Sequence, residues 1–494
     1  MIRKYGVFFS SHRFAIACFS IILLAAFLRF YDIHNRFGLA YDQARDLLVA
    51  RESIREAMLP LIGPFASAGQ FVYGPQWYWI LMAVLLISPS WFLMPWVFLG
   101  ILSCFSVFLL MKTGELIGGR MLAIIVGILA AFSPGEIAQS VNLSSPSMSG
   151  IFSVIALYFF VKLLTKKKEM DVFLLSFFVS TAIMIHFQSI GLIPLLVIGF
   201  LLGKKTIKFS LVYILGFVIP LLPLFYFDIT NNFLESRHVI EFYLHGQDRI
   251  YYPNRWLTYI SVYWPAAWAR IVGAHIVIGY IGFLSFFILF AMFLYKRRPN
   301  RIPLGISVFL CINIVLLRYY KGQLFDSYLV FLHGAVLLMM AIFIYYIYLW
   351  KKIAGIFFLF FVAMASLHGV YLESKGSANG TFLRSESVAR VLEGKFPEKN
   401  FSVYDYRYQS PGVSLPIVLY LDYKQRVSET GVKIGVTSFA DAASMSAFPI
   451  IDTSLDVALL DLSASSEGEL EQVGWGGVNP SDVQRSTVLW YRKE

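Results

Sequence analysis

The sequence predicts an all-α polytopic membrane protein that carries a small α/β domain at its C-terminal end. Hydrophobic residues make up 58% of the 494 residues and charged residues only 14%, with a mean hydropathy of +0.68. In soluble proteins, roughly 45–50% of the residues are apolar and about 25% are charged. The apolar residues also gather in runs long enough to cross a bilayer, and Gly, Ser, Asp and Glu become frequent again after residue 372. These observations exclude a water-soluble protein.

The apolar runs predict eleven membrane crossings. A helix needs about 17–25 apolar residues to cross the hydrocarbon core. Two shorter runs, 171–185 and 190–203, are separated by residues 186–189, which leaves room for a tight turn. The run 77–87 is too short to span, so we expect a helix that lies at the membrane surface. The predicted crossings are 14–31, 91–111, 120–133, 147–163, 171–185, 190–203, 209–227, 273–295, 302–318, 327–349 and 353–372.

The distribution of Lys and Arg predicts the orientation, because these residues collect in short cytoplasmic loops. With the N-terminus in the cytoplasm, the short inner segments hold 18 basic residues. The much longer outer loops before the C-terminal tail, residues 373–494, hold ten. The loops 32–75 and 228–270 and the tail then lie outside the cytoplasm of a multi-pass plasma-membrane protein. The formal charge of +11 is explained by this topology, and we expect no nucleic-acid partner.

The tail predicts a separate domain. Short runs at 401–404, 457–460 and 487–490 are typical of strands, and 381–392 is typical of a helix. We therefore expect a membrane domain of residues 1–372 and an extracytoplasmic α/β domain of residues 373–494.

The first outer loop, residues 32–75, contains the most informative stretch. Asp42, Arg45 and Asp46 recur at i, i+3 and i+4, which places them on one face of a helix. One interpretation of Asp42 is a plain helix N-cap. The other is a carboxylate that acts as a general base at the membrane surface, with Arg45 either positioning it or binding a phosphate. The residues alone leave both open.

A resemblance to a known family favours the second interpretation. Residues 42–52 read Asp-Gln-Ala-Arg-Asp-Leu-Leu-Val-Ala-Arg-Glu. This run resembles the Asp-Glu-x-Arg-Tyr-Ala-Glu-x-Ala-Arg-Glu signature that follows the first membrane helix of GT-C glycosyltransferases. Examples are the protein O-mannosyltransferases (glycosyltransferase family 39) and the lipid A aminoarabinose transferases. Residues 73–79, Tyr-Gly-Pro-Gln-Trp-Tyr-Trp, resemble the Pro-Pro-Leu-x-Tyr-Trp segment that opens their juxtamembrane helix.

The resemblance implies a GT-C-like fold with juxtamembrane helices in the first outer loop, and a sugar donor carried on polyprenyl phosphate. It also implies that Asp42 is the catalytic acidic residue. Gln43 stands where the family has Glu, and Asp46 stands where Tyr is common. Asp46 is therefore a candidate second carboxylate.

Further candidates lie at the outer ends of other predicted spans. His186 and Gln188 occupy the turn between the two short spans, where the family often has a His-containing turn near the lipid phosphate. The turn 318–322 resembles a Tyr-rich turn in which a basic residue approaches that phosphate. Each candidate also has an interpretation as an interfacial or snorkelling side chain. The candidates for binding the substrate and its phosphate are Arg45, Asp46, Tyr73, His186, Gln188, Arg237, Arg318, Tyr320 and Lys321.

The second outer loop gives little support for a metal ion. Many relatives have an Arg and an Asp there, where this chain has Asn142, Ser144 and Ser145, and a divalent ion prefers acidic ligands. We expect nearby Glu136 to be a solvated loop acid. We assign no metal ligands and no certain cofactor, and a divalent ion stays an open alternative.

Taken together, these features predict a membrane hexosyl- or pentosyltransferase. It would move a sugar from a polyprenyl-phosphate carrier to an extracytoplasmic lipid, glycan or protein, with inversion at the anomeric carbon. The expected partners are the lipid-linked donor, membrane lipids and an unidentified acceptor. One alternative is a lipid-linked oligosaccharide ligase or polymerase, which the early position of the Asp42 signature disfavours. A transporter or flippase is disfavoured because the predicted spans carry almost no charge. A non-catalytic scaffold is the third alternative.

Overall fold

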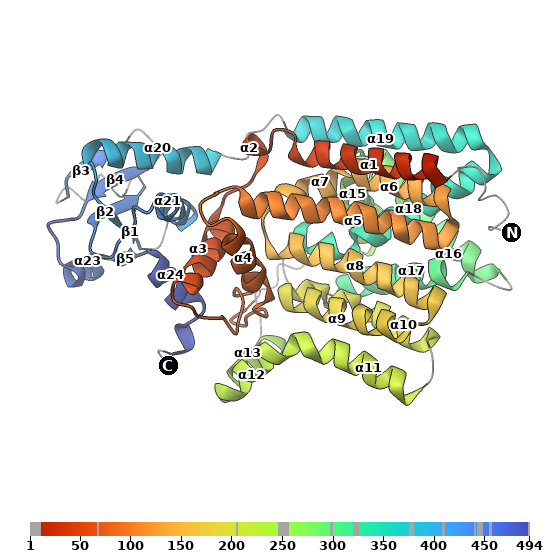
Figure 1. The fold of residues 1–494 in the computed structure, drawn as a ribbon, viewed down its shortest axis with the longest axis horizontal. Helices are drawn as coiled ribbons and strands as arrows, with labels where there is room; N and C mark the ends of the chain where they lie inside the picture. Colours follow the sequence, from red (N-terminus) through yellow and green to blue (C-terminus); the bar gives the residue numbers. More distant parts are fainter. Residues whose placement is uncertain are drawn as a thin grey trace. The chain divides into compact units, whose positions relative to one another are not determined.

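A computed structural model describes residues 11–66, 69–203, 206–245, 256–296, 300–319, 326–374, 380–407, 411–438, 441, 448–453 and 457–492 (Figure 1). The chain divides into two compact units. Unit 1 comprises Met1–Ile33, Phe65–Gln76 and Trp96–Gly376, and unit 2 comprises His34–Pro64, Trp77–Pro95 and Ser377–Glu494. Unit 2 thus combines the tail with two earlier segments of the chain.

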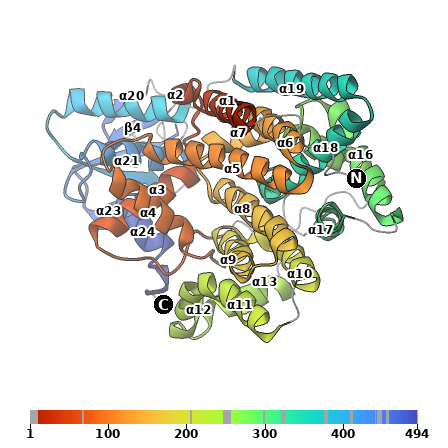
Figure 2. The ribbon, with the colours of Figure 1, turned by 45° about the vertical axis from the view of Figure 1, so that its right-hand side comes forward.

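Unit 1 consists of packed helices (Figures 1 and 2). Its first half contains α1 (Ser11–Phe30), α5 (Met94–Gly118), α6 (Arg120–Phe132), α7 (Pro134–Val141), α8 (Ser145–Lys166), α9 (Glu169–Ile185), the 3₁₀ helix η2 (Phe187–Leu192) and α10 (Ile193–Leu202). Its second half contains α11 (Ile207–Val218), η3 (Ile219–Leu221), α12 (Leu222–Thr230), α13 (Leu234–His245), α14 (Trp256–Thr258), the π-helix η4 (Tyr259–Tyr263), α15 (Trp264–Ile271), α16 (Ile276–Tyr295), α17 (Arg301–Leu317), η5 (Asp326–Leu329), α18 (Val330–Trp350) and α19 (Lys352–Ser374).

The predicted membrane helices are present. Among the described residues, seven helices are long and apolar enough to cross a membrane, or eight if α6 and α7, which meet at a bend of 54°, form one span. The other predicted crossings are helical but short, since α9 and α17 have 17 residues each and η2 interrupts the helix before α10. The polytopic helical fold is confirmed, and the number of eleven crossings stays a prediction.

The core of unit 1 is built around α18. In the span Ser327–Trp350, 83% of the most apolar window is buried, and α18 packs against α6, α8, α16, α17 and α19. A helix that is apolar on all sides is expected to be buried on all sides. The more peripheral α1 and α19 leave large apolar side chains exposed, including Phe19 and Phe357, as expected for a surface that meets lipid.

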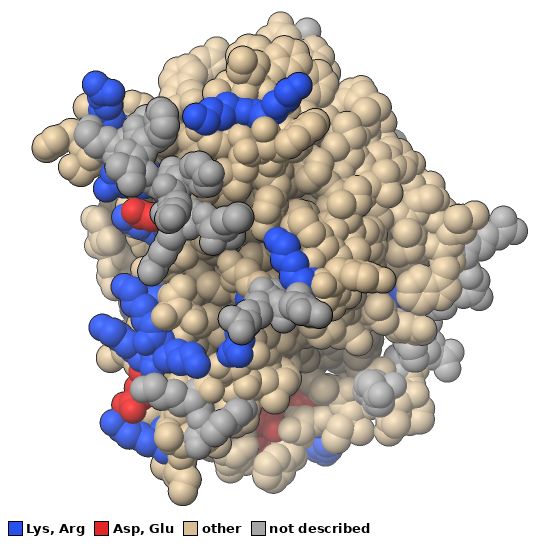
Figure 3. All heavy atoms as spheres, turned by 90° about the vertical axis from the view of Figure 1, so that its right-hand side faces the viewer, with Lys and Arg blue, Asp and Glu red and all other residues tan. Residues whose placement is uncertain are grey.

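Lys and Arg gather at the end of unit 1 where α1 begins (Figure 3). At this end the chain reverses from α8 to α9 through Lys167 and Lys168, and from α18 to α19 through Lys351. Because α9 begins at this end, His186 at its far terminus lies at the opposite end, and the same reasoning places Arg318 there after α17. The sequence assigns the basic end to the cytoplasm, and that assignment stays a prediction.

Unit 2 contains a five-stranded sheet in the order β3-β4-β2-β1-β5. β1 and β2 are parallel and the other neighbours antiparallel, with Phe401 opposite Val432. Its strands are β1 (Phe401–Tyr406), β2 (Val432–Thr437), β3 (Ile450–Asp452), β4 (Ala458–Asp461) and β5 (Trp475–Gly477). Its helices are α20 (Gly380–Lys395), α21 (Pro411–Tyr423), α23 (Glu467–Val473), α24 (Pro480–Thr487), the 3₁₀ helix η6 (Trp490–Arg492), α3 (Tyr41–Arg55) and most of α4 (Gln76–Ile87), while α2 (Ile33–Arg36) lies at the boundary between the units. The small α/β fold at the C-terminal end is confirmed.

The predicted strand at 487–490 is wrong. Asn479 and Asp482 cap the start of α24, with the backbone N–H of Asn479 donating to Asp482 Oδ2 at 3.2 Å, and Pro480 occupies a first-turn position that favours helix. The helix then runs to Thr487 and is followed by η6. The strand preference of β-branched residues is weak and depends on context, and here the local cap and the burial of Val488 override it.

Candidate active site

The first turn of α3 brings together the three charged residues that the spacing predicted. Arg45 Nη1 lies 3.0 Å from Asp42 Oδ1, and Arg45 Nη2 lies 2.8 Å from Asp46 Oδ1. The Asp42 side chain is 64% exposed, whereas that of Asp46 is 5% exposed. Arg45 therefore bridges a carboxylate in water and a carboxylate in the protein interior.

Asp46 is fixed by two further hydrogen bonds. Trp77 Nε1 donates to Asp46 Oδ2 at 2.7 Å, and the hydroxyl of Tyr78 donates to Oδ1 at 3.4 Å. Both donors come from the start of α4, in the segment that resembles the family's juxtamembrane helix. Burial opposes the charged form of Arg45, but its acidic neighbours, Asp46 foremost, outweigh this and hold its pKa well above the usual value. Arg45 thus stays charged and holds Asp42 in place.

The interpretation of Asp42 as the N-cap is wrong. Ala40 is the N-cap, and Gln43 Oε1 accepts a hydrogen bond of 3.0 Å from its backbone N–H. The side chain that replaces the family's Glu therefore satisfies a backbone donor at the helix start. Asp42 makes no cap and keeps an exposed carboxylate in the positive field of the first turn.

The rest of α3 is tied to the C-terminal domain within unit 2. Arg51 and Arg55 both form ion pairs with Asp422 of α21, which is buried. The Arg51 guanidinium also stacks over the Tyr423 ring at 3.9 Å, and α3 packs against α24 (Figures 1 and 2). This clamp was not predictable from the sequence, because charged residues about 370 positions apart in the chain leave no local pattern.

A second group of candidates meets at the end of unit 1 opposite the basic end. The Tyr73 hydroxyl lies 3.2 Å from His186 Nε2, and the Tyr328 ring lies 5.2 Å from the His186 ring. The backbone N–H of Gly74 donates to the Met184 carbonyl at 2.7 Å, which fixes the two segments. Burial lowers the pKa of His186 to about 3, so the ring is neutral, and its Nδ1 has no hydrogen-bond partner among the described residues.

Glu235 of α13 belongs to the same group, which we call the outer cluster: Tyr73, His186, Tyr328 and Glu235. Glu235 Oε1 accepts a hydrogen bond of 2.9 Å from the backbone N–H of Val72, next to Tyr73. Burial, with a smaller contribution from the charge of Asp228, raises the pKa of Glu235 to about 7. Glu235 is not among the residues predicted from the sequence, although it lies in the predicted loop 228–270, two residues before the candidate Arg237. An acid directly after an outer helix was the available signal.

The remaining candidates are more scattered. Gln188 is half-buried on η2 and Arg237 is exposed on α13. Arg318 is buried, with its guanidinium 5.5 Å from the Trp256 ring centre and 5.9 Å from that of Tyr259. Tyr320 and Lys321 lie outside the described residues.

The second outer loop does not provide a metal site. Ser144 and Ser147 hydrogen-bond to each other, and Ser147 also donates to Gln139. The expectation that Glu136 is solvated is wrong, because α7 packs inside the bundle against α15, α18 and α19. Glu136 Oε1 lies 2.8 Å from His333 Nδ1.

Across the described part of the chain, no group of three or more His, Cys, Asp or Glu side chains could hold a metal ion. The donors at this loop therefore do not fit a divalent ion.

No protein-family model and no curated protein sequence matches the chain. Solved structures do match. ArnT from Cupriavidus metallidurans, in a crystal structure bound to undecaprenyl phosphate, gives a TM-score of 0.63 at 11% identity, covering 92% of this chain and 99% of that chain. The apo crystal structure of the same protein gives a TM-score of 0.64 at 11% identity, covering 90% of this chain and 97% of that chain.

The chain therefore has the fold of these two structures. The oligosaccharyltransferase of Archaeoglobus fulgidus, tethered to an acceptor peptide through a disulfide bond, gives a TM-score of 0.50 at 12% identity, covering 85% of this chain and 60% of that chain. At these identities the likeness establishes the fold, and the function must be argued from the residues.

Proposed function

We propose that this chain is a GT-C glycosyltransferase that moves a sugar from a polyprenyl-phosphate carrier to an acceptor outside the cytoplasm. The observation that carries the proposal is the exposed carboxylate of Asp42, held by Arg45 at the start of α3. It occupies the first position of a run that resembles the GT-C signature, in a chain whose fold is similar to that of ArnT bound to undecaprenyl phosphate. ArnT is a lipid A aminoarabinose transferase.

Asp42 acts as the general base in this proposal. The acceptor hydroxyl or amine gives its proton to Asp42 as it attacks the anomeric carbon, and the carrier phosphate leaves from the opposite face. A positioned base of this kind contributes about 10²–10⁴ in rate. Arg45 and Asp46 are positioning residues, because both ends of the guanidinium are occupied by carboxylates. Attack opposite the departing phosphate inverts the anomeric configuration.

The carrier phosphate is assigned to the outer cluster and the basic residues of the neighbouring loops. The neutral His186 and the hydroxyl of Tyr73 offer hydrogen bonds without charge. Gln188, Tyr320 and the cations Arg237, Arg318 and Lys321 complete the candidate set. Guanidinium and ammonium groups stabilise the charge that grows on a departing phosphate. Arg318 is supported by its burial and by the nearby rings of Trp256 and Tyr259, at 5.5 and 5.9 Å from its guanidinium.

The proposal includes the orientation of the chain in the membrane. The end of unit 1 that carries Lys and Arg (Figure 3) faces the cytoplasm of a plasma-membrane protein, as the excess of inner basic residues predicts. The N-terminus is then inside, and α3 and the domain of residues 373–494 are outside, where the sugar is transferred. No nucleotide is needed there, since the carrier itself supplies the leaving group.

The test is consumption of a donor by the purified full chain in detergent. A panel of radiolabelled polyprenyl-phosphate hexoses and pentoses is incubated with membrane extract as the source of acceptor. The proposal predicts that at least one donor is converted to free polyprenyl phosphate and a labelled product whose anomeric configuration is inverted. Consumption of no donor, or a product with retained configuration, would contradict it.

A further inference from the structure

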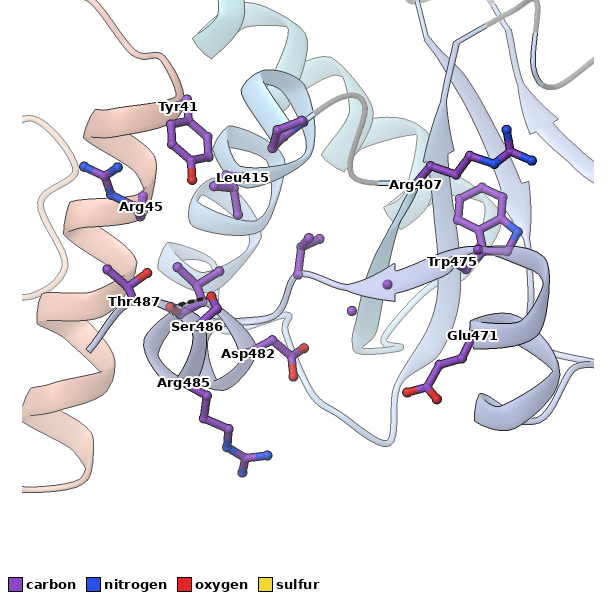
Figure 4. Close-up of a pocket in the computed structure, with 16 residues that line it drawn as sticks. Tyr41, Arg45, Arg407, Leu415, Glu471, Trp475, Asp482, Arg485, Ser486 and Thr487 are labelled. Atoms are coloured by element: carbon purple, nitrogen blue, oxygen red, sulfur yellow. Dashed lines mark hydrogen bonds between the residues drawn. The ribbon is translucent and has the colours of Figure 1, made fainter. Parts of the chain in front are cut away.

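The helix α3, which carries the proposed base, packs against the C-terminal tail within unit 2. At its start, Tyr41 and Arg45 line the same cavity as Thr487 of α24 (Figure 4). Farther along, the buried side chains of Ser53 and Gln484 form a hydrogen bond of 3.2 Å. The helix also packs against α21. The tail therefore contacts α3 from its first turn to its last.

One buried carboxylate of the tail holds the far end of α3. Asp422, near the end of α21, is only 3% exposed, and its two oxygens pair with Arg51 Nε and Arg55 Nη2. Arg51 Nη1 also donates to the Pro89 carbonyl at 2.9 Å, in the segment that follows α4. The Arg51 guanidinium lies over the Tyr423 ring. Arg51 thus joins α3, α21 and the segment after α4.

This contact fixes the position of α3 as well as attracting it to the tail. Arg51 and Arg55 are four residues apart and lie on one face of the helix, and they bind different oxygens of the same carboxylate. A contact at two points restricts both the rotation of α3 about its axis and its displacement along that axis. A buried ion pair is a weak source of stability, because well-packed apolar residues in its place often stabilise as much. Fixed geometry is what this directional contact adds.

The geometry of α3 matters because Asp42 lies on the same helix. α3 is continuous from Tyr41 to Arg55, so a rotation or a displacement at Arg51 is transmitted to Asp42. A misplacement of about 1 Å can cost an enzyme about 10² in rate, even when its cause lies far from the reacting atoms.

We propose that Asp422 is a positioning residue for sugar transfer, through which the tail holds the base Asp42 where it meets the acceptor. This inference rests on the proposed function. Among the described residues, Asp422 is the acid that pairs with Arg51, whereas Arg55 also pairs with Glu52 at 3.0 Å. Loss of the Asp422 charge therefore affects Arg51 most.

The test is a double-mutant cycle between Asp422→Asn and Asp42→Asn, measured on the full chain with the polyprenyl-phosphate sugar that the wild type consumes. Asp422→Asn keeps the size of the side chain and removes its charge. We expect it to lower the single-turnover rate by about tenfold or more and to leave the affinity for undecaprenyl phosphate within about twofold of wild type. In the Asp42→Asn background the same change should lower the remaining rate by less than about twofold, because the base that it positions is already absent.

Two further variants complete the cycle. The side chain of Arg55 is 44% exposed, so Arg55→Gln disturbs the contact less than Asp422→Asn and should lower the rate by about threefold. It replaces Asp422→Asn in the same cycle if that variant does not fold. The matched control is Glu393→Gln, which neutralises an exposed acid on α20 of the same domain and should transfer sugar at the wild-type rate.

A second measurement is made without any donor. Amide hydrogen exchange in α3 should be at least about tenfold faster in Asp422→Asn than in the wild type, since the helix has lost its main contact at the far end. Exchange in α18, at the core of unit 1, should stay within about twofold of wild type.

Equal factors of rate loss in the two backgrounds would overturn the proposal, because a general loss of structure lowers the rate whether or not the base is present. A wild-type rate in Asp422→Asn, or unchanged exchange in α3, would also overturn it. If the wild type consumes no donor, the proposed function fails, and the exchange measurement still decides whether Asp422 holds α3.

Discussion

The α3 group (Asp42, Arg45 and Asp46) and the outer cluster each contain a buried acid, but the two acids have different partners. Asp46 in α3 forms an ion pair with the guanidinium of Arg45 and accepts a hydrogen bond from the indole N–H of Trp77. Glu235 in the outer cluster accepts a single backbone N–H and has the acidic Asp228 nearby. Burial raises the pKa of both carboxyls, but only Asp46 has a cation to oppose the rise. The comparison shows that the neighbouring group decides the role of a buried acid. Beside the cation Arg45, Asp46 helps to hold a charged group in place, whereas Glu235, which has no such cation, approaches neutrality.

The largest expected effect on stability comes from removing the buried acid of the α3 group. Asp46→Ala leaves Arg45 partly buried without its main counter-charge and leaves Trp77 Nε1 without its acceptor. Breaking a buried ion pair in this way costs about 3–5 kcal/mol. The measurement is thermal unfolding of the full chain in detergent, followed by tryptophan fluorescence. Asp42→Ala removes the exposed partner of the same Arg and should cost at most about 1 kcal/mol. Equal losses would show that the two carboxylates are not differently placed.

The raised pKa of Glu235 predicts that the free energy of unfolding depends on pH. Its pKa is about 7 in the folded chain against an ordinary value of 4.5, so the folded state binds the proton more tightly. The stability from this group is complete below about pH 4.5 and is lost as the pH rises to about 7, a change of about 3 kcal/mol. Glu235→Gln cannot ionise and keeps an oxygen for the Val72 N–H. Its unfolding temperature should therefore change less than that of wild type between pH 5 and 8.

The control for that experiment is Glu241→Gln, an exposed acid on the same helix α13, which should follow the wild-type profile. Identical pH profiles for wild type and Glu235→Gln would show that Glu235 does not titrate as its surroundings require.

The smallest effect is expected for the hydroxyl of Tyr73. Tyr73→Phe removes the contact of 3.2 Å with His186 Nε2 and should cost about 1 kcal/mol, the net value of a single hydrogen bond. If the outer cluster recognises the carrier, the same variant also weakens binding of undecaprenyl phosphate. Tyr295→Phe removes an exposed hydroxyl at the end of α16, away from the outer cluster, and should change neither property. A normal affinity for undecaprenyl phosphate in Tyr73→Phe would remove Tyr73 from the binding site.

The comparison also shows what the sequence could predict. The α3 group depends on a spacing of three and four residues on one helix, so Asp42, Arg45 and Asp46 were foreseen as one face, and the ion pairs agree. The outer cluster joins residues 72–73, 186, 235 and 328, which come together only through the packing of the helices. Single members such as His186 and Tyr73 were chosen from their loops, but their contact and the role of Glu235 were not predictable.

Two of the wrong expectations, the strand at 487–490 and a solvated Glu136, have related causes. The strand at 487–490 was predicted from β-branched residues, and the cap formed by Asn479 and Asp482 produced a helix instead. Glu136 was predicted to be a solvated loop acid, but α7 follows a bend of 54° and packs inside the bundle. In both places a local pattern was overruled by structure that begins a few residues earlier.

The claim that Asp42 is the general base is tested most directly by single-turnover transfer with Asp42→Asn. The substitution keeps size and polarity but cannot accept the proton. We predict that the rate of donor consumption falls by about 10²–10⁴, while the affinity for the donor and the unfolding temperature stay at wild-type values. Glu56→Gln, which neutralises an exposed acid at the end of the same helix, should transfer sugar at the normal rate. A rate for Asp42→Asn equal to that of wild type would contradict the account.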